Sequence, residues 1–262
     1  MNKKVKRILI TLVVLAIVWL GACYSLLIVS PKMIFKCGKS KNIVFNIQPV
    51  QEFRLNAAGD SIDILWIAND TAKITYLYLS GNIGRLPKII DDLHPFGNIC
   101  APAYPGYSKS TGLPTTENTY ETVDIAIKFL KEKNIDLKNT VILGHSLGGS
   151  PAMYAAVHYP ELKKVITVNT FYSMTKMCED KYKILCLFSG SILNTASLAP
   201  NAKAPVLICH NPVDSLISFE QGEMLYKIVG SSQKEFRKIS GNHSEFNMAE
   251  VLNIPFPSKK EK

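Results

Sequence analysis

Hydrophobic and polar positions divide the chain into an apolar N-terminal run and a longer body of strand-like and helix-like patterns. Residues 8–29 carry no charge, and a helix of this length can span a bilayer. The first strand-like runs of the body, at 43–47, 62–68 and 73–79, follow one another without a helical pattern between them. They predict an antiparallel meander at the start of a sheet.

From residue 86 the pattern changes to helices that alternate with strands. The helical patterns occupy 86–93, 116–133, 147–158, 220–229 and a last segment after residue 243. The strand-like runs between them occupy 98–103, a stretch that begins at 141, 165–168, 206–209 and 235–239. This alternation implies βαβ units, a mostly parallel sheet and a doubly wound α/β fold.

The segment 171–201 lies between two predicted strands and breaks the alternation. A loop of this length inside a compact domain is usually functional or partly helical. We interpret it as a small cap over a functional site, with a pair of short packing helices as the alternative. Its apolar residues are Phe171, Met174, Met177, Leu185, Leu187, Phe188, Ile192 and Leu193.

The predicted domain organisation has four parts. A basic tail and a membrane anchor occupy 1–30, a linker with the first strand occupies 31–50, the globular domain with its cap occupies 51–254, and a basic tail occupies 255–262. An uncleaved anchor is favoured over a signal peptide, because the apolar core of a signal peptide is usually shorter.

Charge does not decide the side of the membrane. Four basic residues precede the apolar run and four follow it closely, so the positive-inside bias is nearly balanced. By convention an N-terminal signal anchor leaves the body outside the cytoplasm, and we favour that side. The stretch Leu20-Gly21-Ala22-Cys23 resembles a bacterial lipoprotein cleavage site, although the hydrophobic run continues beyond it.

Net charge and cysteine spacing narrow the choice of partners. The net charge is +9, but the lysines are scattered without interleaved aromatic residues, so we expect an anionic membrane surface rather than nucleic acid. The six cysteines show no C-x-x-C spacing, and no metal or other cofactor is expected. A Cys178–Cys186 disulfide would require an oxidising compartment. The oligomeric state cannot be predicted from these features.

The stretch 141–149, Val-Ile-Leu-Gly-His-Ser-Leu-Gly-Gly, carries the strongest chemical signal. It predicts a buried strand that enters a G-x-S-x-G turn and then a helix, with the hydroxyl of Ser146 lifted above the sheet edge. The flanking glycines leave room for the neighbouring strand and helix. The helix N-terminus suits a developing oxyanion. Because such a pentapeptide also occurs by chance, its meaning depends on a base, an acid and an oxyanion donor elsewhere.

Three further positions supply those partners. The expected chain order is serine, acid, histidine, and His243 lies in the loop after the last predicted strand. Asp214 is the acidic residue between them that follows a buried strand by a short loop, and Asp180 in the cap is the alternative. The oxyanion would bind the backbone N–H of Leu147 and that of Asn82, which lies in a turn after a strand. Ile83 is the alternative donor, and an ordinary tight turn is the plain alternative.

Together these segments resemble the α/β-hydrolase superfamily, and in particular its small, N-terminally anchored serine hydrolases related to monoacylglycerol lipases and lysophospholipases. The resemblance covers residues 50–250 and rests on the turns at 80–82 and 104–108, the G-x-S-x-G stretch, and the segments 205–219 and 241–243. Two positions depart from the family pattern. Ser80 stands where a histidine is usual, and Asn211 stands where a glycine usually follows His210. Neither departure touches the three triad positions.

The resemblance implies an α/β-hydrolase fold behind one transmembrane helix. We expect a serine hydrolase that cleaves lipid or other acyl esters or thioesters through an acyl-enzyme on Ser146, with Tyr107, Phe171 and Met174 as substrate contacts. A serine peptidase is the enzymatic alternative, because the family does not fix the substrate. A catalytically silent, membrane-tethered scaffold of the same fold is the alternative from another class, and the departure at Ser80 favours it.

Overall fold

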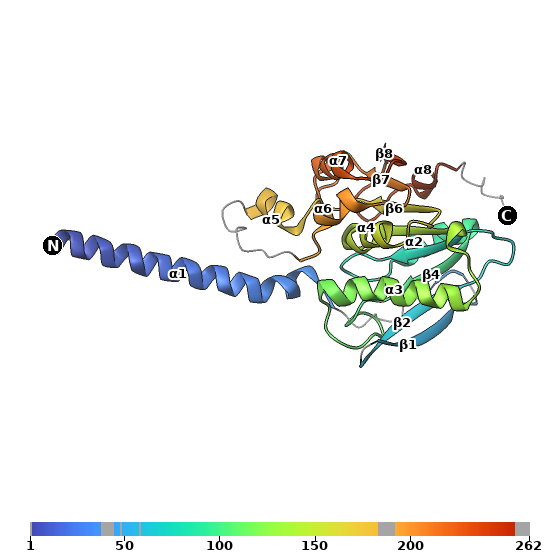
Figure 1. The fold of residues 1–262 in the computed structure, drawn as a ribbon, viewed down its shortest axis with the longest axis horizontal. Helices are drawn as coiled ribbons and strands as arrows, with labels where there is room; N and C mark the ends of the chain where they lie inside the picture. The colour runs from blue at the N-terminus through green and yellow to red at the C-terminus, as the bar shows by residue number, and fades with distance from the viewer. Residues whose placement is uncertain (1, 38–44, 48, 58, 183–191, 255–262) are drawn as a thin grey trace.

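A long N-terminal helix and an α/β domain make up the computed structural model, which describes residues 2–37, 45–47, 49–57, 59–182 and 192–254 (Figure 1). α1 (Lys3–Ile34) projects away from the domain. Its stretch Lys3–Ala22 is long and apolar enough to cross a membrane, and no part of it is buried against the rest of the chain. The helix continues past the predicted end of the anchor at residue 30.

The domain is organised around an eight-stranded sheet in the described part of the chain, with the order β1-β2-β4-β3-β5-β6-β7-β8. The strands are β1 (Gln51–Ala57), β2 (Asp60–Ile67), β3 (Thr75–Leu79), β4 (Asn98–Pro102), β5 (Thr140–His145), β6 (Lys164–Val168), β7 (Val206–His210) and β8 (Lys234–Lys238). β2 pairs antiparallel with both β1 and β4, and the remaining pairs are parallel. The mostly parallel sheet with an antiparallel start is therefore confirmed. The predicted meander is wrong in one strand, because β3, expected to continue it, pairs in parallel with β4 and β5, and β4 takes the place beside β2.

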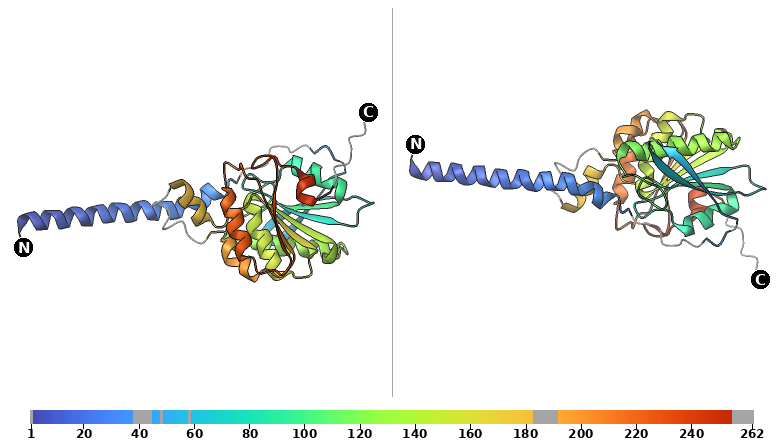
Figure 2. Two further views of the ribbon diagram at one scale, coloured as in Figure 1. Left: turned by 90° about the horizontal axis from the view of Figure 1, so that it is seen from above. Right: turned by 90° about the horizontal axis from the view of Figure 1, so that it is seen from below.

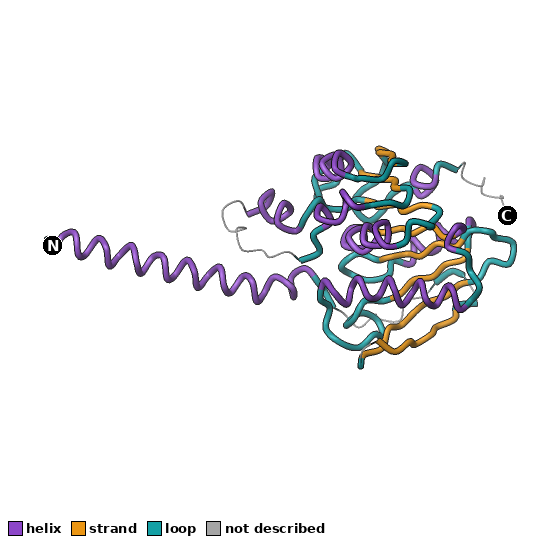
Figure 3. The backbone as a smooth tube through the Cα atoms, viewed as in Figure 1, coloured by secondary structure: helices purple, strands orange, loops and turns teal. Residues whose placement is uncertain are grey.

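Helices cover both faces of this sheet, as a doubly wound fold requires (Figures 2 and 3). They are α2 (Pro87–Leu93), α3 (Thr116–Glu132), α4 (Gly149–His158), α5 (Met174–Tyr182), α6 (Thr195–Leu198), α7 (Phe219–Ile228) and α8 (Met248–Leu252). On β5, Ile142 faces the cluster that contains α3, α4 and α7, whereas Val141 and Leu143 face the cluster that contains α2 and α8. Because alternate residues of a strand point to opposite faces, a strand covered on both sides reads as one apolar run.

The beginning of the sheet differs from the prediction. The predicted strand at 43–47 lies partly outside the described residues, and its described part, 45–47, is not a strand. Phe45 and Ile47 instead pack against the apolar cluster of α2 and α8. The first strand is β1, in which Phe53 and Leu55 pack on the other face of the sheet. Their alternation with charged residues is a strand signal that the prediction did not use.

The segment 171–201 holds two short helices, α5 and α6, in its described part. Leu185, Cys186, Leu187 and Phe188 lie outside the described residues. The remaining apolar residues of the segment join a third cluster, here called the elbow cluster, which is separate from the two clusters on the sheet faces. Its buried members are Phe35, Ala103, Tyr104, Tyr107, Leu147, Phe171, Leu193 and Ile217, and Ile34, Tyr120, Met174, Met177 and Ile192 pack against them.

One edge of the sheet gathers the segments that bear on function. The parallel strands β3, β4, β5, β6 and β7 all end at this edge, because parallel strands share their carboxyl side. α1 and α5 lie at the same end of the molecule, and α8 lies toward the opposite end (Figures 1 and 2). We call this side of the sheet the carboxyl edge.

Candidate active site

Ser146 lies at the sharp turn between β5 and α4, residues 144–149, which we call the elbow. Its backbone φ is 54°, in the left-handed region, where a residue with a side chain is strained by about 1–3 kcal/mol. A Cβ atom on Gly144 would lie 2.3 Å from the carbonyl oxygen of Gly148, and one on Gly148 would lie 2.0 Å from the carbonyl oxygen of Leu79. Both flanking positions therefore exclude a side chain, which is the reason for the G-x-S-x-G pattern here.

The structure brings together the three residues that were predicted as a triad. His243 Nε2 lies 2.9 Å from Ser146 Oγ, and His243 Nδ1 lies 2.7 Å from Asp214 Oδ2. Because a carboxylate can only accept, Nδ1–H donates to Asp214 and Nε2 is free to accept from the serine hydroxyl. The Asp214 side chain is fully buried, whereas 14% of the His243 side chain is exposed.

The loop after β7 fixes the carboxylate of Asp214. Asp214 Oδ1 accepts hydrogen bonds from the backbone N–H groups of Leu216 and Ile217, at 2.8 and 3.1 Å. Burial alone would raise the pKa of Asp214, but the hydrogen bonds from His243 and from the two N–H groups outweigh it and lower the pKa below its usual value. This aspartate is therefore held as the anion.

Two neighbouring groups do not compete with this arrangement. His210 Nε2 lies 3.8 Å from Asp214 Oδ2, but it donates to the carbonyl oxygen of Ile217 at 3.0 Å, and burial lowers the pKa of His210. Asp180, the alternative acid, accepts instead from Lys176 Nζ at 2.7 Å and from Gln221 Nε2 at 2.8 Å. It ties α5 to α7.

Asn169 and His145 bind the backbone of the loop that carries His243, here called the base loop. The sequence-based prediction missed both roles. Asn169 follows β6 with a backbone φ of 50° and is fully buried. Its Nδ2 donates to the carbonyl oxygens of Asn242 and His243 at 3.1 and 3.0 Å, and its Oδ1 accepts from the N–H of Asn211 at 2.9 Å. His145 Nε2 also donates to the carbonyl oxygen of His243, at 2.8 Å. A polar residue directly after a buried strand was the available signal for Asn169.

Asn211, which departs from the family pattern, stabilises the loop that carries Asp214, here called the acid loop. Asn211 Oδ1 accepts from the N–H of Val213 at 2.8 Å, and the carbonyl oxygen of Asn211 accepts from the N–H of Asp214 at 3.1 Å. An asparagine that bonds its own backbone two residues on forms such a turn without a glycine. The substitution for glycine is thus compatible with the position of the carboxylate.

The predicted oxyanion turn lies directly against the elbow. A Cβ atom on Gly81 would lie 3.4 Å from Ser146 Cβ. The carbonyl oxygen of Gly81 accepts from the N–H of Gly84 at 3.1 Å, inside the turn. Because C=O and N–H point in opposite directions in a trans peptide, the N–H of Asn82 points away from the turn interior.

Two tyrosines from the 104–108 turn support this loop. Tyr104 donates to the carbonyl oxygen of Ser80 at 3.2 Å, and Tyr107 donates to the carbonyl oxygen of Asn82 at 3.0 Å. Tyr107, predicted as a substrate contact, is 3% exposed and so serves the position of the turn. The other predicted contacts, Phe171 and Met174, lie in the elbow cluster beside Leu147, the first being buried and the second partly so.

A buried ion pair next to the turn at 80–84 also fixes its position. Arg85 pairs with Asp63 of β2, and both side chains are 3% exposed. Arg85 Nη2 also donates to Ser108 Oγ at 2.8 Å, and Ser108 Oγ donates to Asp63 Oδ2 at 3.0 Å. These bonds join the turn at 80–84, the turn at 104–108 and the sheet. The position of the turn is thus fixed by bonds that do not involve residue 80.

The cysteines of the described part of the chain are not among the residues that hold the triad. Within the described residues, no group of three or more histidine, cysteine or acidic side chains is placed to hold a metal ion. Cys37, Cys100 and Cys209 are free, whereas Cys178 is disulfide-bonded. The predicted partner of Cys178, Cys186, lies outside the described residues.

Removing one member of the buried ion pair should cost more stability than removing both. Arg85→Met leaves the Asp63 carboxylate buried without its partner, and we expect it to lower the free energy of unfolding by about 3–5 kcal/mol. Arg85→Met combined with Asp63→Leu should restore part of that loss. Chemical denaturation of the full chain in detergent measures both, and an equal or larger loss in the double variant would contradict the role of the pair.

The buried imidazole of His145 should make the fold sensitive to acid. Burial, and next the nearby His243, lower the pKa of His145 from 6.5 to about 4. In the unfolded chain this imidazole binds a proton below pH 6.5, so the free energy of unfolding should fall by about 3 kcal/mol between pH 6.5 and 4. His145→Asn should flatten this dependence, whereas His158→Asn, at an exposed position, should not. Denaturation across this pH range decides, and an unchanged slope in His145→Asn would speak against the mechanism.

Known proteins provide an independent comparison. A sequence profile of the alpha/beta hydrolase fold family matches residues 97–214. Human alpha/beta hydrolase domain-containing protein 17B is 27% identical over 176 residues, which cover 64% of this chain and 60% of the human protein. An uncharacterized membrane protein of Saccharomyces cerevisiae is 30% identical over 192 residues, which cover 68% of this chain and 68% of the yeast protein.

Solved structures agree on the fold. An esterase of Pyrococcus furiosus superposes with a TM-score of 0.65 at 16% identity, covering 80% of this chain and 91% of the esterase chain. A cold-adapted esterase from an Arctic intertidal metagenomic library reaches 0.60 at 19% identity, covering 77% and 89%. The family profile, the relatives, the sheet order and the elbow together show that the chain belongs to the α/β-hydrolase superfamily.

Proposed function

We propose that this protein is a serine hydrolase that cleaves carboxylic esters or thioesters, with Ser146 as nucleophile, His243 as base and Asp214 as the residue that orients the base. The observation that supports this most is the line of hydrogen bonds from Ser146 Oγ through His243 to Asp214 Oδ2, at 2.9 and 2.7 Å. A nucleophile, a base and an orienting acid in this geometry are the requirements of acyl transfer.

The proposed reaction proceeds through an acyl-enzyme. Ser146 Oγ attacks the carbonyl carbon while His243 Nε2 takes its proton, and the anionic Asp214 stabilises the resulting imidazolium. The tetrahedral oxyanion accepts hydrogen bonds from the N–H groups of Leu147 and Asn82. Collapse breaks the bond to the leaving alcohol or thiol, which takes the proton from His243. A water molecule, deprotonated by His243, then attacks the acyl-enzyme and releases the acid.

Apolar surroundings support an acyl substrate. Leu147, the proposed oxyanion donor, lies in the elbow cluster together with Phe171 and Met174, so the carbonyl group would be flanked by apolar side chains. Solved relatives of the same fold are described as esterases. Tyr104 and Arg85 hold the turn in which Ser80 departs from the family pattern, which supports an enzyme over a silent scaffold.

We further propose that α1 spans a membrane once and that the catalytic domain lies outside the cytoplasm. The length and composition of α1 support the span, as does the description of the yeast relative as a membrane protein. The disulfide at Cys178 supports the side, because disulfides persist in oxidising compartments and are rare in the cytosol.

Ser146→Ala should abolish labelling by a fluorophosphonate probe, because the probe bonds only to an activated serine hydroxyl. Wild-type protein should label, and so should the matched control Ser150→Ala, which removes a buried serine from α4. In-gel fluorescence of the full chain in detergent measures all three. Labelling of Ser146→Ala at the wild-type level, or no labelling of the wild type, would end this assignment.

Asp214→Asn should lower kcat/KM for a short-chain ester by about 10⁴, since the neutral amide neither fixes the reactive tautomer of His243 nor stabilises its cation. Asp180→Asn is the control, because that carboxylate bonds Lys176 and Gln221 rather than His243. Steady-state hydrolysis by both variants tests the choice of acid. A comparable loss in the two would argue against Asp214.

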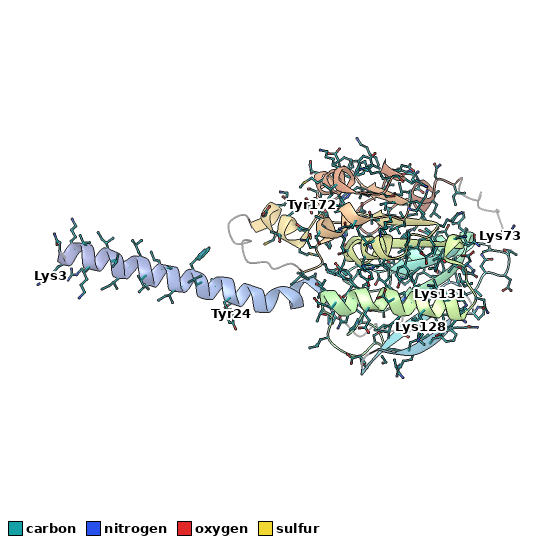
Figure 4. The ribbon with its side chains drawn as sticks, viewed as in Figure 1. Lys3, Tyr24, Lys73, Lys128, Lys131 and Tyr172 are labelled. Atoms are coloured by element: carbon teal, nitrogen blue, oxygen red, sulfur yellow. The ribbon has the colours of Figure 1, made fainter. Side chains whose placement is uncertain are left out.

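Amine labelling should reveal the orientation. With the catalytic domain outside, a membrane-impermeant amine reagent added to intact cells should label the exposed Lys128 and Lys131 of α3 (Figure 4). Lys3, at the other end of α1, should label only after permeabilisation. Mass spectrometry of the labelled peptides gives the pattern, and the reverse pattern would place the domain in the cytoplasm.

A further inference from the structure

Four large hydrophobic side chains outside α1 are exposed in the described part of the chain. They are Ile83 (60% exposed), Leu113 (81%), Val213 (75%) and Leu216 (38%). Single exposed hydrophobic residues are ordinary, but a group of them on one side of a molecule marks an interaction surface. The position of these four in the fold is therefore informative.

All four lie on loops at the carboxyl edge of the sheet. Ile83 lies in the turn after β3, Leu113 in the loop between β4 and α3, and Val213 and Leu216 in the loop between β7 and α7. β3, β4 and β7 run in the same direction within one sheet, so their carboxyl ends share this edge. Within the described residues, the opposite edge carries no exposed large hydrophobic side chain. We call the four residues the apolar rim.

The anchor helix enters the domain at the same edge. α1 ends at Ile34, and the next residue, Phe35, is 4% exposed and packs in the elbow cluster with Tyr107 and Leu147. The uncharged run ends at Val29, and five more helical residues add roughly 8 Å along the axis at 1.5 Å each. No slack segment separates the end of the apolar run from the packed residue. A bilayer around α1 would therefore lie close to the carboxyl edge.

We propose that the apolar rim docks on the surface of the bilayer that α1 spans, and that a lipid ester reaches Ser146 directly from that surface. The second half rests on the proposed function, whereas the docking itself rests only on the rim and on α1. The bilayer is the occupant because the anchor joins the domain through Phe35 at the same edge as the rim, which would hold these loops near the lipid–water boundary. Apolar side chains at that depth are stabilised by the acyl region beneath the headgroups.

Docking in this way would select one class of substrate. Ser146 follows β5 at the same edge, with Leu147 in the elbow cluster beside it. A substrate whose acyl chain lies in the membrane would present its ester carbonyl at headgroup depth, where the rim holds the site. The favoured substrates are therefore esters with chains that partition into lipid rather than small soluble esters.

Fluorescence quenching tests the docking without reference to catalysis. Leu113→Trp places a reporter on the rim, and Lys73→Trp places the control at the opposite edge, far from α1 (Figure 4). The full chain is reconstituted into phosphatidylcholine–phosphatidylglycerol vesicles with or without brominated acyl chains, and the emission of the wild type is subtracted. Because docked side chains sit roughly 5–10 Å into the interface, we expect bromolipid to quench the Leu113→Trp increment about twofold. The Lys73→Trp increment should not change.

A kinetic comparison supplies the second readout. For each variant, the rate on a long-chain monoacylglycerol in the vesicles is divided by its rate on a soluble short-chain ester, so that effects on the site itself cancel. Leu113→Glu and Val213→Glu should each lower this ratio about fivefold in anionic vesicles, the effect of one charge near such a surface. Lys73→Glu should leave the ratio at the wild-type value, because its charge lies well beyond the screening length.

The outcomes separate the two proposals. Quenching at Leu113→Trp with no hydrolysis of either ester would keep the docking and overturn the proposed function. Hydrolysis with no quenching, and an unchanged ratio in the Glu variants, would overturn the docking. If bromolipid does not quench the extra emission of Leu113→Trp but the tryptophan is shielded from acrylamide, the rim is covered by a protein partner or by a second copy. This outcome also overturns the proposal.

Discussion

The alignment of the candidate triad depends on how one carbonyl group is held. The carbonyl oxygen of His243 accepts from His145 Nε2 at 2.8 Å and from Asn169 Nδ2 at 3.0 Å. His145 belongs to the strand that leads into the elbow, and Asn169 also binds the N–H of Asn211 in the acid loop. One backbone atom thereby ties the base loop to the strand before Ser146 and, through Asn169, to the loop of Asp214. Because His145 and Asn169 are buried, neither bond competes with water.

A second constraint fixes the turn that faces the elbow. The buried pair of Arg85 and Asp63 joins this turn to β2, and Ser108 bonds both members. A buried ion pair is an expensive way to gain stability, since desolvation offsets much of the attraction. What it provides here is a single position for the turn, which an oxyanion donor requires. The loss of the usual histidine at position 80 is thus compatible with an active enzyme.

The anchor, the cap and the candidate site share one end of the molecule. α1 reaches the domain through Phe35, which packs beside Leu147, and α5 lies at the same end (Figures 1 and 2). With α1 spanning a bilayer as proposed, a connection at the opposite edge would leave the site facing bulk water. The connection at the carboxyl edge would instead hold the elbow close to that bilayer, so it bears on which substrates the site can meet.

The sequence by itself determined the features that arise from local rules. Periodicity identified the helices and most strands, and the run at 141–149 predicted the elbow, because a strand, a strained turn and a helix start are encoded by adjacent residues. Chain order and loop position selected Ser146, Asp214 and His243, whose catalytic roles stay predictions. The strand β1 was missed although its alternation of apolar and polar residues is a local signal. The apolar residues at 45–47, predicted as part of a strand, instead pack against the cluster of α2 and α8, because strand pairing and packing favour the same residue types.

Only the tertiary structure decided the contacts between segments that lie far apart in the chain. The bonds of Asn169 to His243, of Arg85 to Asp63 and of Tyr107 to Asn82 link residues separated by 74, 22 and 25 positions. No pattern within one element encodes such a partner, because it depends on the strand order and on which loops meet at the carboxyl edge. The same holds for Phe35 and the apolar rim, which come to one edge of the sheet only when the sheet has formed.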